Sequence, residues 1–70
     1  MDNQIKKTVR LNGHTTSLAL EKEFWKELNI IAKNQSLSLN ALVEKIDTLE
    51  RKGSLASSIR VFILKTLKDK

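Results

Sequence analysis

A chain of only 70 residues that contains no cysteine has few ways to stabilise a folded state. A domain of this size buries a modest share of its surface, so it usually needs disulfides, a structural metal or a partner subunit. The absence of cysteine excludes disulfides and thiolate zinc sites, and the single histidine, His14, offers no recognisable metal-ligand spacing. We therefore expect a homodimer that needs neither metal nor cofactor.

The composition is that of a folded, soluble chain. Apolar residues make up 40% of it, and the charged 30% is mixed in sign, which is not typical of disorder. No apolar run approaches the roughly 20 residues that span a bilayer, and the first seven residues do not resemble a signal peptide. We expect a cytoplasmic protein that does not bind membranes.

The net charge of +5 is unevenly distributed. Residues 21–34 and 38–53 each balance three acids with three bases, whereas residues 1–20 carry three bases against one acid. Residues 54–70 carry four bases against one acid. Positive charge gathered on particular elements favours a polyanion as the partner, although general solubility is an alternative explanation.

Residues 6–20 predict a β-hairpin. Asn12-Gly13 is a strong signal for a type I′ turn, which needs positive φ at both central positions. In that register the numbers of paired residues sum to 25, and alternate residues face opposite sides. One face then collects Val9, Leu11, Leu18 and Leu20. The other face collects Thr8, Arg10, Thr15, Ser17 and Ala19. The alternative is a loop at the turn, with only the second strand ordered.

Three helices are predicted after the hairpin. The first runs from about Lys22 to Asn34, the second begins after Ser38 as N-cap and ends at Gly53, and Ser54 caps the third. Their apolar stripes are Phe24, Leu28, Ile31 and Ala32, with Trp25 beside them; Leu39, Leu42, Val43, Ile46 and Leu49; and Leu55, Ile59, Phe62, Ile63 and Leu67.

The third helix is apolar over much of its circumference, because Val61 and Leu64 widen its stripe. It should pack on two surfaces, one of which could belong to a partner subunit. Residues 61–64 could also form a short strand. The expected fold is therefore mainly α with a short β element. We expect residues 1–5 to form a flexible tail and residues 6–70 to form one domain.

Five segments resemble one known family. They are R-L-N-G-H-x-T-S at 10–17, L-E-x-E-F-W at 20–25, S-L-N-A-L at 38–42, I-D at 46–47 and L-A-S-S-x-R at 55–60. Together they cover roughly residues 8–68 and resemble ribbon-helix-helix domains of small bacterial and phage repressors, in particular a bacterial variant with an additional C-terminal helix. In that fold, two chains pair one strand each into an antiparallel ribbon, and four helices cover its apolar face.

The resemblance implies a homodimeric DNA-binding protein that regulates transcription. By position, the base-facing residues would be Thr15, Ser17 and Ala19, and the hairpin register adds Arg10 beside Thr15 as a candidate guanine contact. The shared core of the dimer would include Leu18, Leu20, Phe24, Leu28, Leu42 and Ile46.

Phosphate contacts are expected at the start of the second helix. Free backbone N–H groups around Leu39 and Asn40, together with the helix dipole, can bind an anion, and the side chains of Ser38 and Asn40 could help. Plain N-capping is the alternative role for Ser38. Lys6 and Lys7 are further candidate phosphate contacts, or else part of a solvated arm.

The sequence alone leaves three questions open. A sheet combining two hairpins would be four strands wide, which exceeds a major groove of about 12 Å. The same dimer could instead be a protein-interaction module, for example an antitoxin or adaptor, without reading DNA.

Phe24 and Trp25 could form a ligand platform, but their helical spacing favours the core. Because His14 and the serines lack catalytic partners, we do not expect an enzyme.

Overall fold

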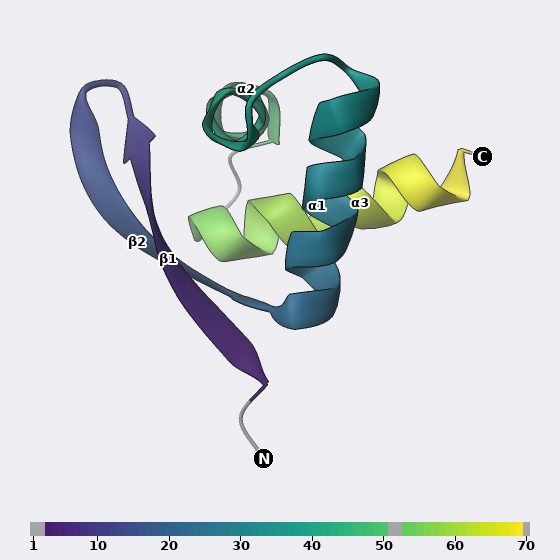
Figure 1. The fold of residues 1–70 in the computed structure, drawn as a ribbon, viewed down its shortest axis with the longest axis horizontal. Helices are drawn as coiled ribbons and strands as arrows, with labels where there is room; N and C mark the ends of the chain where they lie inside the picture. Colours follow the sequence, from purple (N-terminus) through teal and green to yellow (C-terminus); the bar gives the residue numbers. More distant parts are fainter. Residues whose placement is uncertain (1–2, 51–52, 70) are drawn as a thin grey trace.

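The computed structural model describes residues 3–50 and 53–69 as a β-hairpin followed by three helices. The strands are β1 (Gln4–Leu11) and β2 (His14–Glu21), and the helices are α1 (Lys22–Asn34), α2 (Leu39–Glu50) and α3 (Leu55–Lys68). The hairpin lies along one side of the three helices, and the C-terminal half of α3 extends past α1 (Figure 1). This is the mainly α fold with an N-terminal β element that the sequence predicts.

The hairpin has the predicted register. β1 pairs antiparallel with β2, with Arg10 opposite Thr15 and Leu11 opposite His14. Asn12 and Gly13 both have positive φ, at 52° and 84°, as a type I′ turn requires. The alternative with only the second strand ordered is therefore wrong. β1 begins at Gln4, so residues 4 and 5 of the expected flexible tail belong to the strand, while residues 1 and 2 lie outside the described residues.

The helix boundaries follow local capping signals. α1 has the predicted bounds, and the hydroxyl of Ser38 accepts from the Ala41 backbone N–H at 3.0 Å at the start of α2. Ser54 caps α3 in the same way through the Ser57 N–H at 3.1 Å. Residues 61–64 are helical, so the strand alternative for them is wrong. Among the described helices, none is both long and apolar enough to cross a membrane.

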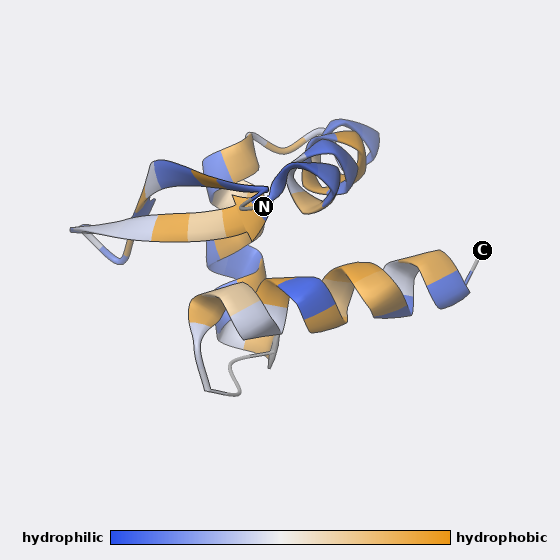
Figure 2. Cartoon of the chain, turned by 90° about the horizontal axis from the view of Figure 1, so that it is seen from below, coloured by the Kyte–Doolittle hydropathy of each residue, from blue (hydrophilic) through white to orange (hydrophobic). Residues whose placement is uncertain are grey.

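The hydrophobic core lies between one face of the hairpin and all three helices. β2 changes from near-neutral residues near the turn to apolar ones where it meets the helices (Figure 2). The buried apolar residues are Val9, Leu18, Leu20, Trp25, Leu28, Ile31, Ala32, Leu42, Val43, Ile46, Ile59 and Ile63. Each of the five elements contributes to this core, which explains why so short a chain can enclose an apolar interior.

Two details of the apolar stripes differ from the sequence expectation. Trp25, placed beside the stripe of α1, is buried, whereas Phe24 is only half-buried. The indole can be buried because its Nε1–H donates to the Ile5 carbonyl at 2.8 Å. Leu49, assigned to the stripe of α2, is 63% exposed near the end of that helix. Exposed apolar residues also occur on α3, at Val61, Leu64 and Leu67.

The residues expected in a shared dimer core are mostly buried within one chain. Five of the six, namely Leu18, Leu20, Leu28, Leu42 and Ile46, have exposures of 2% or less, and Phe24 is half-buried. β1 of the same chain pairs with one edge of β2, as the hairpin prediction requires, and pairing of β2 with a second copy stays a prediction. Their burial is therefore explained without a second subunit, and a role at a dimer interface stays a prediction.

The orientation of β2 can be tested by placing a charge on it. Leu18→Asp should abolish folding, because its cost exceeds the roughly 2–5 kcal/mol of a buried Leu→Ala change by the penalty for a buried carboxylate. Thr16→Asp, at an exposed position two residues earlier, should stay folded. Circular dichroism and urea unfolding measure both variants. A well-folded Leu18→Asp protein would show that the strand faces are assigned wrongly.

Candidate nucleic-acid interface

The outward side of the hairpin is a continuous polar face. Its eight residues alternate along both strands: Gln4, Lys6, Thr8, Arg10, Thr15, Ser17, Ala19 and Glu21. Arg10 lies opposite Thr15, Thr8 opposite Ser17 and Lys6 opposite Ala19. The face thus brings together all four residues predicted to face bases, and it adds Lys6, which the sequence suggested only as a backbone contact. Ala19 is half-buried, and Arg10, Thr15 and Ser17 are exposed.

The carboxamide of Asn40 holds the backbone of Arg10. Its Oδ1 accepts from the Arg10 N–H and its Nδ2 donates to the Arg10 carbonyl, both at 2.8 Å. One turn further along α2, the Glu44 carboxylate accepts from the Asn12 N–H at 3.4 Å. The N-terminus of α2 is therefore fixed beside the turn end of β1. Arg10 keeps its side chain on the polar face while its backbone is tied to α2.

These contacts change the expected roles at the start of α2. The Ser38 hydroxyl accepts from the Ala41 N–H, so its observed role is that of an N-cap. Both polar atoms of the Asn40 side chain bind the Arg10 backbone instead of extending into solvent as phosphate ligands. An anion at this helix start would therefore meet backbone N–H groups, at Leu39 and Asn40, more readily than side-chain donors.

Lys6 and Lys7 point to opposite sides of the sheet. Lys6 lies on the polar face, whereas Lys7 lies opposite Leu18 on the side that packs on the helices. The Lys7 Nζ atom stands 4.9 Å from the centre of the Trp25 ring, a cation–π contact. The sequence treated the two lysines as one basic pair. Because side chains alternate between the two faces of a strand, Lys6 is a candidate phosphate contact, whereas Lys7 covers the core.

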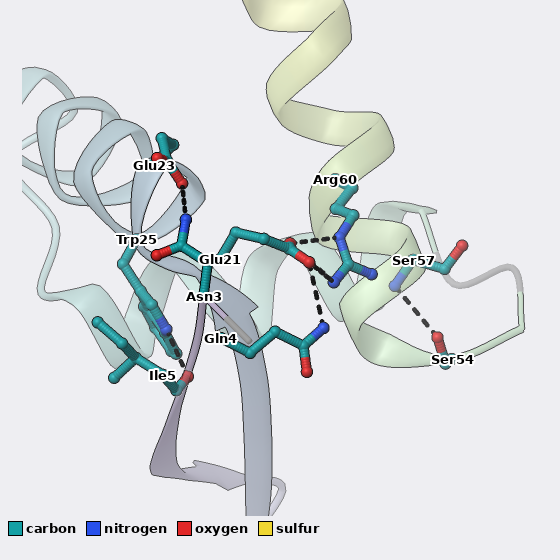
Figure 3. Close-up of polar contacts among 9 residues, drawn as sticks. All are labelled: Asn3, Gln4, Ile5, Glu21, Glu23, Trp25, Ser54, Ser57 and Arg60. Atoms are coloured by element: carbon teal, nitrogen blue, oxygen red, sulfur yellow. Dashed lines mark hydrogen bonds and ion pairs between the residues drawn. The ribbon is translucent and has the colours of Figure 1, made fainter. Parts of the chain in front are cut away.

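Glu21 and Arg60 connect the end of β2 to α3 (Figure 3). Two guanidinium nitrogens, Nη2 and Nε, donate to Glu21 Oε1 at 2.9 and 3.1 Å, while Gln4 Nε2 donates to Oε2 at 3.1 Å. The Arg60 guanidinium also lies over the Phe24 ring, 5.7 Å from its centre. One of the C-terminal bases thus links α3 to β2, and the only carboxylate on the polar face is paired with its positive charge.

The described part of the chain contains no pocket, and no three of its His, Cys, Asp or Glu side chains gather in a way that could hold a metal ion. Trp25 is buried against Ile5 and Lys7, so it does not present a free ring to a ligand.

Comparison with known families agrees with this architecture. A sequence model described as "Ribbon-helix-helix domain" matches residues 4–67, which include the hairpin and nearly all of the three helices. The chain therefore belongs to the ribbon-helix-helix domain family, whose members are typically DNA-binding transcription regulators or antitoxins and generally form dimers. Searches of curated proteins and of solved structures gave no significant match.

The Glu21–Arg60 contact should make stability depend on pH. Hydrogen bonds from Gln4, from the backbone and from Arg60 lower the pKa of Glu21 below its ordinary value of 4.5. A lowered folded-state pKa adds stability above the unfolded value, and this stability is lost as pH falls through the folded value. Glu21→Gln should therefore be less stable than wild type at neutral pH, and the difference should shrink below pH 4.5.

Urea unfolding of both proteins across this pH range measures the effect. Gln4→Ala is the matched partial variant, because it removes the largest contribution and leaves Arg60 in place. A difference between Glu21→Gln and wild type that stays constant down to acidic pH would show that the charge of Glu21 contributes nothing to folding.

Proposed function

We propose that this protein is a homodimeric regulator of transcription that binds double-stranded DNA in the bacterial cytoplasm. The observation that carries the proposal is the polar face of the hairpin, which presents Lys6 and Arg10 while its single acid, Glu21, is bound by Arg60. A polar β surface with net positive charge can approach the phosphates and base edges of a groove. Membership in the ribbon-helix-helix family supports the same function.

Base contacts would come from four residues of this face. Arg10 carries the strongest recognition group, because a guanidinium can donate two hydrogen bonds to the major-groove edge of guanine. The hydroxyls of Thr15 and Ser17 can bond to several bases, and the Ala19 methyl can only contact a thymine methyl. Since Asn40 fixes the Arg10 backbone, the position from which this long side chain extends is defined before DNA binds.

Phosphate contacts would flank this readout. Lys6 shares the polar face, and the start of α2, at Ser38, Leu39 and Asn40, adds backbone N–H groups and the positive end of the helix dipole. Asn40 is bonded to the Arg10 backbone, so the start of α2 lies beside Arg10, and Lys6 lies earlier on the same strand as Arg10. Lys7 would reach a phosphate only by leaving the Trp25 ring.

The width of the sheet limits how deeply this face can enter DNA. One hairpin spans a single strand spacing of about 4.8 Å and fits a major groove about 12 Å wide. Two hairpins joined in one sheet would span three spacings, or about 14 Å, and would lie across the groove. In that arrangement the long side chains of Lys6 and Arg10 would reach DNA more readily than the short ones of Thr15 and Ser17.

A second candidate is a protein-interaction module of the antitoxin or adaptor type. The observation that favours it is the exposed apolar side of α3, where Val61, Leu64 and Leu67 are 39%, 58% and 41% exposed. This side could bind a partner protein without any contact to DNA. Binding to DNA should depend strongly on salt, whereas binding to an apolar partner should barely depend on it. The first experiment measures this difference.

Binding to duplex DNA should weaken linearly on a plot of log affinity against log salt concentration, with a slope of about −0.9 for each phosphate neutralised. Fluorescence anisotropy with a labelled duplex at several salt concentrations measures this slope. Absence of duplex binding even at low salt would contradict the DNA-binding proposal and leave the protein-interaction module as the better explanation.

Arg10→Ala should reduce the preference for a selected DNA sequence, at a cost of about 1–3 kcal/mol against the correct site. It should leave dimerisation intact, because only the backbone of Arg10 is bonded to Asn40. Lys6→Ala, on the same face, is the matched control: it should weaken all duplexes about equally and reduce the salt slope by about one unit. Unchanged sequence preference in Arg10→Ala would refute a reading role for this residue.

A further inference from the structure

The first strand of the hairpin determines how this surface can approach DNA. In the ribbon-helix-helix fold each chain contributes one strand to the ribbon, whereas this chain has two, and Arg10 lies on the first. A sheet made of two complete hairpins is too wide for a major groove, so deep entry would require β1 to move away from β2. The contacts between β1 and the helices decide whether such a movement is favourable.

The N-terminal half of β1 is attached to α1. Just before the strand, Asn3 Nδ2 donates to the Glu23 carboxylate at 2.9 Å, and the Trp25 indole N–H donates to the Ile5 carbonyl at 2.8 Å (Figure 3). The Lys7 ammonium stands over the same ring, 4.9 Å from its centre. Since Trp25 is only 3% exposed, removal of β1 would uncover a large apolar ring and leave its N–H without this partner.

The other half of β1 is attached to α2. Asn40 binds both backbone groups of Arg10 at 2.8 Å, and Glu44, one turn further along the helix, accepts from the Asn12 N–H. The backbone groups of the residues on either side of Arg10 point toward β2, so β1 is bonded along both edges here. Val9 is 4% exposed and belongs to the core. Separation of the strands would break all of these contacts together.

We propose that β1 keeps this position when DNA binds, so that the closed hairpin reads the duplex through Arg10, and that Asn40 is the residue that positions Arg10. This inference rests on the DNA binding of the proposed function and specifies the strand that carries the readout. The duplex then lies across the polar face, and no strand leaves the sheet. Asn40 makes no base contact itself, because both polar atoms of its side chain are bonded to the Arg10 backbone.

The carboxamide of Asn40 suits this positioning role. It offers one acceptor and one donor, which match the N–H and the C=O of a single strand residue, so both backbone groups of Arg10 are held. A bidentate contact between a guanidinium and guanine requires a defined geometry, and a fixed backbone reduces the number of conformations that the long side chain must lose. Phosphate contacts carry no sequence information, so Asn40 should affect sequence preference more than general affinity.

A disulfide across the hairpin tests whether β1 stays in place. Because the backbone groups of Arg10 point to Asn40, Arg10 and its partner Thr15 are not hydrogen-bonded to each other, and by alternation the same holds for Thr8 and Ser17. The Cα atoms of such a pair lie about 4.5 Å apart, which a disulfide can span. Since the chain has no cysteine, Thr8→Cys combined with Ser17→Cys introduces the only two thiols.

The reduced form of this double variant is the matched control for its oxidised form, and fluorescence anisotropy with a labelled duplex measures both. We expect the same affinity and the same salt slope in the two forms, with mass spectrometry showing that the disulfide lies within one chain. Loss of duplex binding on oxidation, with recovery on reduction, would mean that the strands separate on DNA and would overturn the proposal. Wild type that binds no duplex at low salt would instead contradict the proposed function itself.

The positioning role of Asn40 is tested by combining Asn40→Ala with Arg10→Ala. Alone, Asn40→Ala should lower the preference for a selected sequence, by a factor within the roughly 5- to 150-fold that a bidentate contact supplies, and should leave the salt slope unchanged. In the Arg10→Ala background it should lower the preference no further. Asn34→Ala, at an exposed position at the end of α1, should behave as wild type. Equal losses in both backgrounds would overturn the positioning role, and the disulfide tests β1 even if Asn40→Ala does not fold.

Discussion

The pairing of β1 with β2 through the Asn12-Gly13 turn is the constraint on which the rest of the structure depends. It fixes a register in which Leu18 and Leu20 face the helices while Arg10, Thr15 and Ser17 face solvent. Because a shift by one residue would exchange the two faces, the same turn determines both the hydrophobic core and the candidate DNA surface. It also provides β2 with a partner inside the chain, which lets one copy enclose a core.

Two contacts between distant residues attach the hairpin to the helices. Asn40 binds the Arg10 backbone near the turn, and Arg60 binds Glu21 at the opposite end of β2. The first sets where the N-terminus of α2 lies relative to the polar face. The second pairs the only carboxylate of that face with a positive charge. Stability and the charge of the surface therefore depend on the same side chains, so substitutions here affect folding and binding together.

The features that sequence predicts correctly are those fixed by local chemistry. The turn gives the hairpin register, and Ser38 and Ser54 mark the starts of α2 and α3, because each effect spans only a few residues. The Asn40–Arg10 and Arg60–Glu21 contacts join residues 30 and 39 positions apart, and no local pattern signals them. The position of Asn40 at a helix start favours a side-chain phosphate ligand, and nothing in that position signals its bonds to the Arg10 backbone.

The central claim is that duplex DNA binds to the polar face of the hairpin. Its most direct test is backbone amide NMR during titration with a duplex. We expect the chemical shifts of Arg10, Thr15 and Ser17, together with those at the start of α2, to change, while those of the outer side of α3 stay constant. Changes confined to Val61, Leu64 and Leu67, with an unperturbed hairpin, would contradict it.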